Sequence, residues 1–241
     1  MKLFQDWFLK IGLLGSTILG TSLIVTIPAQ AIPVPQVVAK LQNIVVYLIT
    51  DDQGVVLHGT NTGNGKQTPQ ISTGVFFSSK DAQSFIDRSI KPTQPEISKI
   101  VKITPVSLGE IYRRQQANKN KPQEMNYIYV PTVQQANAAL AILNQNGKKI
   151  DRVTSSPVFI ATIVSASGKE DYLTFTRDNQ SIVPLFFSKE ALQSTVQKVY
   201  PALGDKLKVQ VVELNNLLGY MTDTSDPVAQ IFEFNPNTDV K

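Results

Sequence analysis

The sequence predicts a mixed α/β (α+β) fold made of two repeats, each a small mixed sheet with helices packed on it. Three observations lead to this prediction. Apolar runs of strand character alternate with stretches of helical periodicity. The same series of elements occurs twice in one order. Hairpin turns join some of the strands, which favours mixed sheets over purely parallel ones. We expect a pseudo-twofold axis to relate the repeats.

The first 31 residues are interpreted as a signal peptide rather than as part of the fold. Lys2 and Lys10 give a weakly basic start, diluted by Asp6, before the uncharged stretch 11–27, and Ala29-Gln30-Ala31 has the small–any–small form that signal peptidase accepts. We therefore expect cleavage after Ala31. The alternative is a retained membrane anchor, although the uncharged stretch is short for crossing a bilayer. The sequence Ile-Pro-Val-Pro that follows prevents a helix from continuing out of the leader.

The first repeat, residues 32–150, includes a linker helix at its end. Strands are expected at 45–50, 71–77, 101–107 and 127–131. Ser78 is a natural N-cap because its hydroxyl can accept a free amide of the first helical turn, and Asp81 then lies where the helix dipole favours negative charge. A short helix is expected from Leu108, and the linker helix from Val133. Three polar segments are interpreted as surface loops: 59–70, 91–95 and 113–123.

The second repeat, residues 151–241, contains these elements again. Residues 75–84 match 185–194, so that Ser188 is equivalent to Ser78. The other matches follow in the same order: 45–49 with 159–163, 101–112 with 207–218, and 127–131 with 231–236. Matching elements in one order indicate a duplication.

The composition excludes several classes of chemistry. The chain has 241 residues, a net charge of +4, one His and no Cys. Disulfides, thiolate metal sites and Cys nucleophiles are therefore excluded, and the modest charge argues against nucleic acid as a partner. We expect no metal and no cofactor, and we consider binding a better first hypothesis than catalysis.

Segments that are similar to binding or catalytic motifs have simpler explanations. The loop 59–68 is similar to a phosphate-binding loop, but Gln67 occupies the place where that motif requires Ser or Thr. Adjacent carboxylates lie at two hairpin turns, where Asp stabilises the bend: Asp51 with Asp52, and Glu170 with Asp171.

Two basic or titratable features leave alternatives open. His58 has no partner nearby in sequence, and a hydrolytic enzyme that uses it is the weakest of our hypotheses. A basic stretch without interleaved aromatic residues is either a solvated loop or a contact for an anionic lipid surface or an acidic client: Arg113, Arg114, Lys119 and Lys121.

Apolar stripes on the second, short helix of each repeat are the candidate client-binding groove. They are Leu108, Ile111 and Tyr112 in the first repeat, and Leu217, Leu218, Tyr220 and Met221 in the second. Such stripes face the core in most proteins. The alternative is that part of each stripe lines an apolar groove, which would give two grooves related by the pseudo-twofold axis.

Three segments together resemble the Tic twenty-two-like family, which includes a subunit of the chloroplast inner-envelope protein translocon and its cyanobacterial relatives. They are 45–54, 74–83 and 105–112, of which Val-Ser-Leu-Gly-Glu-Ile-Tyr is the most specific piece. The resemblance covers about 44–236 and is of the cyanobacterial type. It implies an exported, pseudosymmetric α/β protein with apolar pockets, a chaperone-like role in preprotein translocation or outer-membrane biogenesis, and no catalytic residue.

The function expected from these observations is non-enzymatic. A chaperone-like protein would shield apolar segments of unfolded precursors or outer-membrane proteins, in contact with the outer-membrane assembly machinery and with at most peripheral membrane association. The alternative is a fixed docking subunit of a translocation or assembly complex with one folded partner. The expected location is the periplasm, with the thylakoid lumen as a second address.

Overall fold

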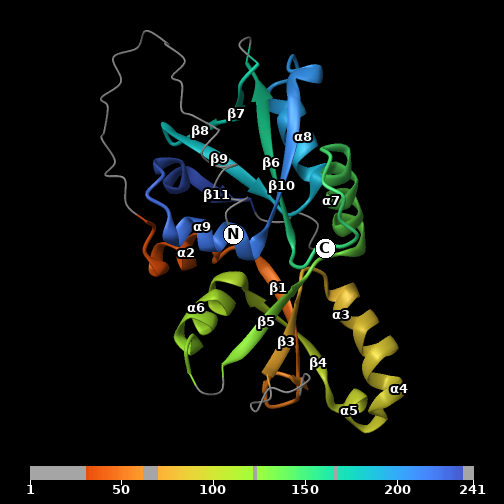
Figure 1. The fold of residues 1–241 in the computed structure, drawn as a ribbon. Helices are drawn as coiled ribbons and strands as arrows, with labels where there is room; N and C mark the ends of the chain where they lie inside the picture. The colour runs from red at the N-terminus through yellow and green to blue at the C-terminus, as the bar shows by residue number, and fades with distance from the viewer. Residues whose placement is uncertain (1–30, 62–69, 122–123, 166–167, 236–241) are drawn as a thin grey trace.

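The computed structural model describes residues 31–61, 70–121, 124–165 and 168–235, and Figure 1 shows two lobes, each built around one sheet. The first lobe contains, in order, α2 (Val34–Leu41), β1 (Val45–Thr50), β2 (Gly59–Asn61), β3 (Gln70–Phe76), α3 (Ser79–Phe85), η1 (Ile86–Ile90), α4 (Lys91–Thr93), α5 (Pro95–Ile100), β4 (Lys102–Ser107), α6 (Leu108–Asn118) and β5 (Met125–Val130). The second contains α7 (Val133–Gln145), β6 (Pro157–Val164), β7 (Glu170–Tyr172), β8 (Phe175–Arg177), β9 (Gln180–Phe186), α8 (Lys189–Val199), η2 (Gly204–Lys206), β10 (Leu207–Glu213), α9 (Leu214–Asp223), η3 (Pro227–Ile231) and β11 (Phe232–Phe234). Within the described ranges, every helix is too short or too polar to cross a bilayer.

Four strands of each sheet are arranged in the same way, and β7 of the second sheet has no counterpart among the strands of the first. In the first, β1 pairs antiparallel with β4 and β3, and β3 pairs parallel with β5. In the second, β6 pairs antiparallel with β10 and β9, and β9 pairs parallel with β11. The mixed α/β fold predicted from the sequence is therefore confirmed, and equivalent strands occupy equivalent places in the two sheets. The pseudo-twofold axis itself stays a prediction.

Hydroxyl caps fix where the helices begin. Ser78 accepts a hydrogen bond from the Asp81 amide at the start of α3, and Ser188 accepts one from the Ala191 amide at the start of α8. Thr132 caps α7 in the same way. Each such cap contributes about 1 kcal/mol of helix stability. These local bonds explain why α3, α7 and α8 begin where the sequence predicted.

Two predicted loops are wrong. Residues 113–118 of the predicted loop 113–123 belong to α6, because Arg, Gln and Ala favour a helix even without an apolar period, and Glu110 pairs with arginines one turn later. The predicted loop 91–95 contains α4 and the first residue of α5. Its prolines lie in the first turn of each helix, where the missing amide is tolerated. Of the predicted loop 59–70, residues 62–69 lie outside the described part of the chain.

The helix α2 was not predicted, because Ile-Pro-Val-Pro suggested only a helix end. The prolines instead occupy the beginning of this helix, with Pro33 as its N-cap. The helix packs against α6 of its own lobe and against α9 and β11 of the other lobe. Lys40 Nζ donates to the carbonyl oxygens of Gln230 and Phe232 at 3.0 Å and 2.8 Å. This helix therefore connects the two lobes.

The largest apolar core lies between the lobes. The rings of Phe77 and Phe187, at the ends of equivalent strands, have centroids 4.8 Å apart, and Phe187 stacks on Phe234 at 5.8 Å. A second cluster lies between the second sheet and helices α7 and α8, and a third lies between the first sheet and the helical arm α3–α5. Because both lobes contribute to the largest core, they form one folded unit.

Candidate functional site

A cleft of about 390 Å³ opens where the lobes meet. Two of its walls come from equivalent segments, Phe77–Asp81 after β3 and Phe187–Ser188 after β9. The third wall is the beginning of α7, residues 132–135, and Tyr47 and Ser156 complete the lining. Strand pairing sets this geometry, because β3 and β9 end at equivalent places and bring the two Phe rings together.

Polar groups at three helix N-termini surround this cleft. Gln135 fixes α7 to α8, since its side-chain amide donates to Glu190 Oε2 at 2.8 Å and its carbonyl oxygen accepts from the Lys189 amide at 3.0 Å. Burial acts against the charge of Glu190, but hydrogen bonds from Gln135, its own backbone amide and Ser188 hold its pKa below the ordinary value. These contacts fix the beginning of α7, which lines the cleft, and the carboxylate of Glu190 behind it stays ionised at neutral pH.

Apolar groups also reach the cleft. Val133 lies at the first position of α7 and is 69% exposed, the largest exposed fraction among the exposed large apolar side chains of the described residues. Phe77 and Phe187 are mostly covered, and Tyr47 is half-buried. The cleft thus combines an aromatic floor with an exposed aliphatic side chain and a rim of hydroxyls.

The predicted groove residues lie in the interior instead of at the surface. Six of them are at most 4% exposed and belong to the core between the lobes: Leu108, Ile111, Tyr112, Leu217, Leu218 and Met221. Tyr220 is half-buried, and its hydroxyl donates to Asp226 at 2.8 Å. The stripes are covered because α2 and the opposite lobe pack on them. A client segment cannot reach the six side chains while the lobes stay packed.

A pocket of about 150 Å³ between α6 and α9 touches two of the predicted residues, Tyr112 and Leu218. Its other lining residues are mainly polar: Gln115, Gln116, Lys119, Asn215, Gly219, Thr222 and Asp223. Burial raises the pKa of the Tyr112 hydroxyl. A pocket this small and polar does not provide an apolar groove.

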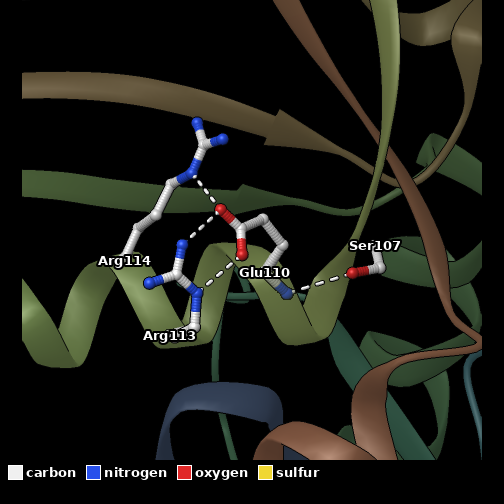
Figure 2. Close-up of polar contacts among 4 residues, drawn as sticks. All are labelled: Ser107, Glu110, Arg113 and Arg114. Atoms are coloured by element: carbon white, nitrogen blue, oxygen red, sulfur yellow. Dashed lines mark hydrogen bonds and ion pairs between the residues drawn. The ribbon is translucent and has the colours of Figure 1, made fainter.

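The basic stretch on α6 is organised by one carboxylate, as Figure 2 shows. Arg113 donates to both oxygens of Glu110 at 2.8 Å, and Arg114 Nε donates to Oε1 at 2.7 Å. The Glu110 amide donates in turn to the Ser107 hydroxyl at 3.1 Å. Hydrogen bonds from Arg113 and then Arg114 lower the pKa of Glu110 to about 2. This arrangement offsets part of the positive charge that the sequence places here.

The remaining residues singled out from the sequence have local roles. Asp51 Oδ1 accepts from the Gln53 and Val55 amides at 2.9 Å and 2.8 Å, which holds the turn. Glu170 accepts from Thr162 and Gln210. His58 is exposed, with Nδ1 3.3 Å from the Val56 carbonyl oxygen. In the described ranges, no three His, Asp or Glu side chains lie close enough to hold a metal ion.

The sequence contains a signal for the position of the cleft in the two matched Phe-Phe-Ser pieces. The matched pieces Phe76-Phe77-Ser78 and Phe186-Phe187-Ser188 mark where each strand ends at the interface and a helix begins. The two pieces form one site because Phe77 and Phe187 contact each other. Only the tertiary arrangement of the lobes brings these rings together, so the sequence alone could not predict the contact.

The fold and the cleft define a class of protein with two mixed α/β lobes that share a common core and have a cleft between them. The family model described as the Tic22-like family matches residues 10–234. The chain therefore belongs to the Tic22-like family, as its resemblance indicated.

Two solved structures are similar to the chain over most of its length. Tic22 from Anabaena, described with the words "protein transport", shares 27% identity at a TM-score of 0.70, covering 86% of this chain and 94% of that one. Tic22 from Plasmodium falciparum shares 22% identity at a TM-score of 0.63, covering 84% and 92%, and this likeness concerns the fold alone. No curated protein matches the chain.

Proposed function

We propose that this protein is a non-enzymatic component of protein transport that binds an extended, apolar segment of a precursor in the cleft between its lobes. The description of the Anabaena relative supports the process. The cleft supports the mode of binding, and its framing by equivalent Phe-Ser segments of both lobes is the observation that carries the proposal.

The chemistry of the cleft suits such a segment. Its volume lies within the range of about 300–1,000 Å³ that is usual for ligand sites. Val133, which is 69% exposed, and the half-buried Tyr47 offer apolar area to one or two client side chains, whereas the Phe77 and Phe187 rings that also line the cleft are buried. Hydroxyls of Ser78 and Thr132 and the first amides of the helices can bind the client backbone, which carries unpaired groups when it is extended. Binding of this kind shields an apolar segment without requiring ATP or a reactive group.

The location belongs to the same proposal. A small–any–small site after an uncharged stretch supports export, and we propose the periplasm as the main address and the thylakoid lumen as a second one. Unfolded outer-membrane precursors are the clients that such an address supplies, and the outer-membrane assembly machinery is the proposed recipient.

Two matched variants test the cleft. Val133→Gln removes exposed apolar area inside the cleft. Val199→Gln removes exposed apolar area outside it, because Val199 is the last residue of α8 and lies about 15 Å from the start of that helix, which faces the cleft. We expect Val133→Gln to weaken binding of a fluorescent peptide from an unfolded outer-membrane protein about fivefold, equivalent to about 1 kcal/mol of lost burial. Val199→Gln should bind as the wild type does. Equal affinities of both variants and the wild type would contradict the cleft assignment.

An aggregation assay separates the two functional hypotheses. The full chain, in molar excess and without ATP, should suppress aggregation of a urea-unfolded outer-membrane protein on dilution. No suppression, together with specific capture of one folded partner in a pull-down, would favour the fixed docking subunit instead. Such a partner would lose binding at a few central residues, whereas a client cleft would show graded losses.

A further inference from the structure

The residue that follows the predicted cleavage point is part of the folded core. Ile32 is 2% exposed, and its backbone N–H donates to the Met221 carbonyl oxygen, in the last turn of α9, at 3.0 Å. The helix α2 begins two residues later, and its Val37 and Leu41 side chains are completely buried. The peptide bond between Ala31 and Ile32 is therefore attached directly to a buried residue.

Proteases cut folded chains at exposed tips or after local opening, because the substrate must extend through the active site. Ile32 cannot extend while it lies in the core and is hydrogen-bonded to Met221. Opening this segment would also break the contacts of α2, including both hydrogen bonds from Lys40 to the other lobe. The folded chain thus presents a poor substrate at this bond.

We propose that docking of residues 32–41 closes the cleavage site, so that the leader is removed before this segment docks and the released amino group then binds at the end of α9. The proposal rests on the predicted cleavage after Ala31 and is independent of the cleft between the lobes. The peptidase adds water across the Ala31–Ile32 bond: Ala31 leaves with a carboxylate, and the Ile32 nitrogen takes up a proton and becomes an ammonium group.

The end of α9 suits this ammonium group. Met221 lies in the last turn of the helix, where the carbonyl oxygens carry the negative end of the helix dipole. The nitrogen keeps the bond to the Met221 oxygen that the amide makes in the uncleaved chain, and it gains a positive charge. Cleavage therefore replaces a neutral hydrogen bond between the lobes by a charge-assisted one, which is roughly twice as strong.

The first experiment measures cleavage of the full chain by a purified bacterial signal peptidase in detergent, with mass spectrometry of the product that begins at Ile32. We expect refolded chain to be cut at least tenfold more slowly than chain diluted directly from urea. Val37→Asp, which places a carboxylate in the core, should be cut at least tenfold faster than refolded wild type. Gln36→Asp places the same group on the exposed side of α2 and should stay resistant.

Contrary outcomes are clear. Equal cutting of refolded and unfolded wild type would overturn the proposal, and so would an unfolded chain that is not cut after Ala31. If circular dichroism shows that Val37→Asp unfolds the whole chain, that variant cannot test the docking of residues 32–41. Hydrogen exchange of the Ile32 amide in refolded wild type then tests it instead. A protected amide with slow cutting supports the proposal, and an unprotected amide refutes it.

The second experiment concerns the released amino group. In the cleaved and folded product, acetylation of the Ile32 amine by acetic anhydride should be at least tenfold slower than in the same product in urea. Equal rates would show that the amine is free and would overturn the second part of the proposal.

Discussion

Replacing Gly109 by alanine should push α2 away from α6. A Cβ at this position would stand 2.6 Å from the Val38 carbonyl oxygen and 2.6 Å from Gln42 Oε1, where ordinary contact begins at 3.4 Å. The Gln42 side chain can rotate away, but the carbonyl belongs to the backbone of α2, so the helix itself must move. Overpacking of this kind costs about 1–3 kcal/mol, and alanine returns at most about 1 kcal/mol as a better helix former. We expect a net loss of about 1–2 kcal/mol.

Gly219→Ala is the matched control, because this glycine also lies inside a helix but a Cβ there would meet no atom within 4 Å. We expect Gly219→Ala to stabilise the fold by about 0.5–1 kcal/mol. In thermal unfolding followed by circular dichroism, Gly109→Ala should lower Tm by about 2–8 °C and Gly219→Ala should raise it by about 1–4 °C. A Gly109→Ala protein at least as stable as wild type would refute the close approach of α2 to α6.

Three further predictions concern charge and burial. Because the pKa of Glu110 is lowered from 4.5 to about 2, its ionised form stabilises the fold above pH 4.5, and this stabilisation is lost as the pH falls towards 2. Glu110→Gln should therefore make the stability measured by urea unfolding depend less on pH on the acid side. The difference between the variant and the wild type should be smaller in high salt. Lys40→Met removes a charged donor from two carbonyl oxygens, which should cost about 1–3 kcal/mol in urea unfolding; no change would show that water replaces the lysine. Leu217→Asp buries a carboxylate in the core between the lobes and should unfold the chain at neutral pH by circular dichroism, whereas a cooperative fold with weaker client binding would return this residue to a groove.

Local chemistry explains what could be predicted from the sequence. Ser78 and Ser188 cap helices through bonds to amides three residues later, so neighbouring residues are sufficient to predict them. Strands β3 and β9 each end within a short apolar run that stops at a serine, residues 75–77 before Ser78 and 185–187 before Ser188, and this pattern needs no tertiary information. The predicted duplication rests on these same local features and stays a prediction, although the central strands of the two sheets pair in the same way.

The fate of the apolar stripes could not be predicted, because it depends on what covers them. Leu108 and Leu217 have the same helical spacing whether they face a core or an open groove. The cover includes α2, whose proline-rich beginning concealed it, and the opposite lobe, whose position no local pattern encodes. Gly109, in the most specific segment of the family resemblance, has its physical reason in that same contact, since only a glycine lets α6 approach the α2 backbone so closely.

The helices that precede the first strand of each sheet take unlike positions, and this difference bears on how many client segments one chain can bind. A helix precedes the first strand of each sheet, α2 before β1 and α7 before β6. The second packs on β6 and β10 and forms a wall of the cleft, whereas the first packs on α6, α9 and β11 and connects the lobes. A symmetric copy of the cleft would need α2 in the place equivalent to that of α7, where it does not lie. Two grooves related by a twofold axis were the alternative that the sequence left open, but this geometry favours one bound segment per chain, and a titration followed by fluorescence anisotropy would measure that stoichiometry directly.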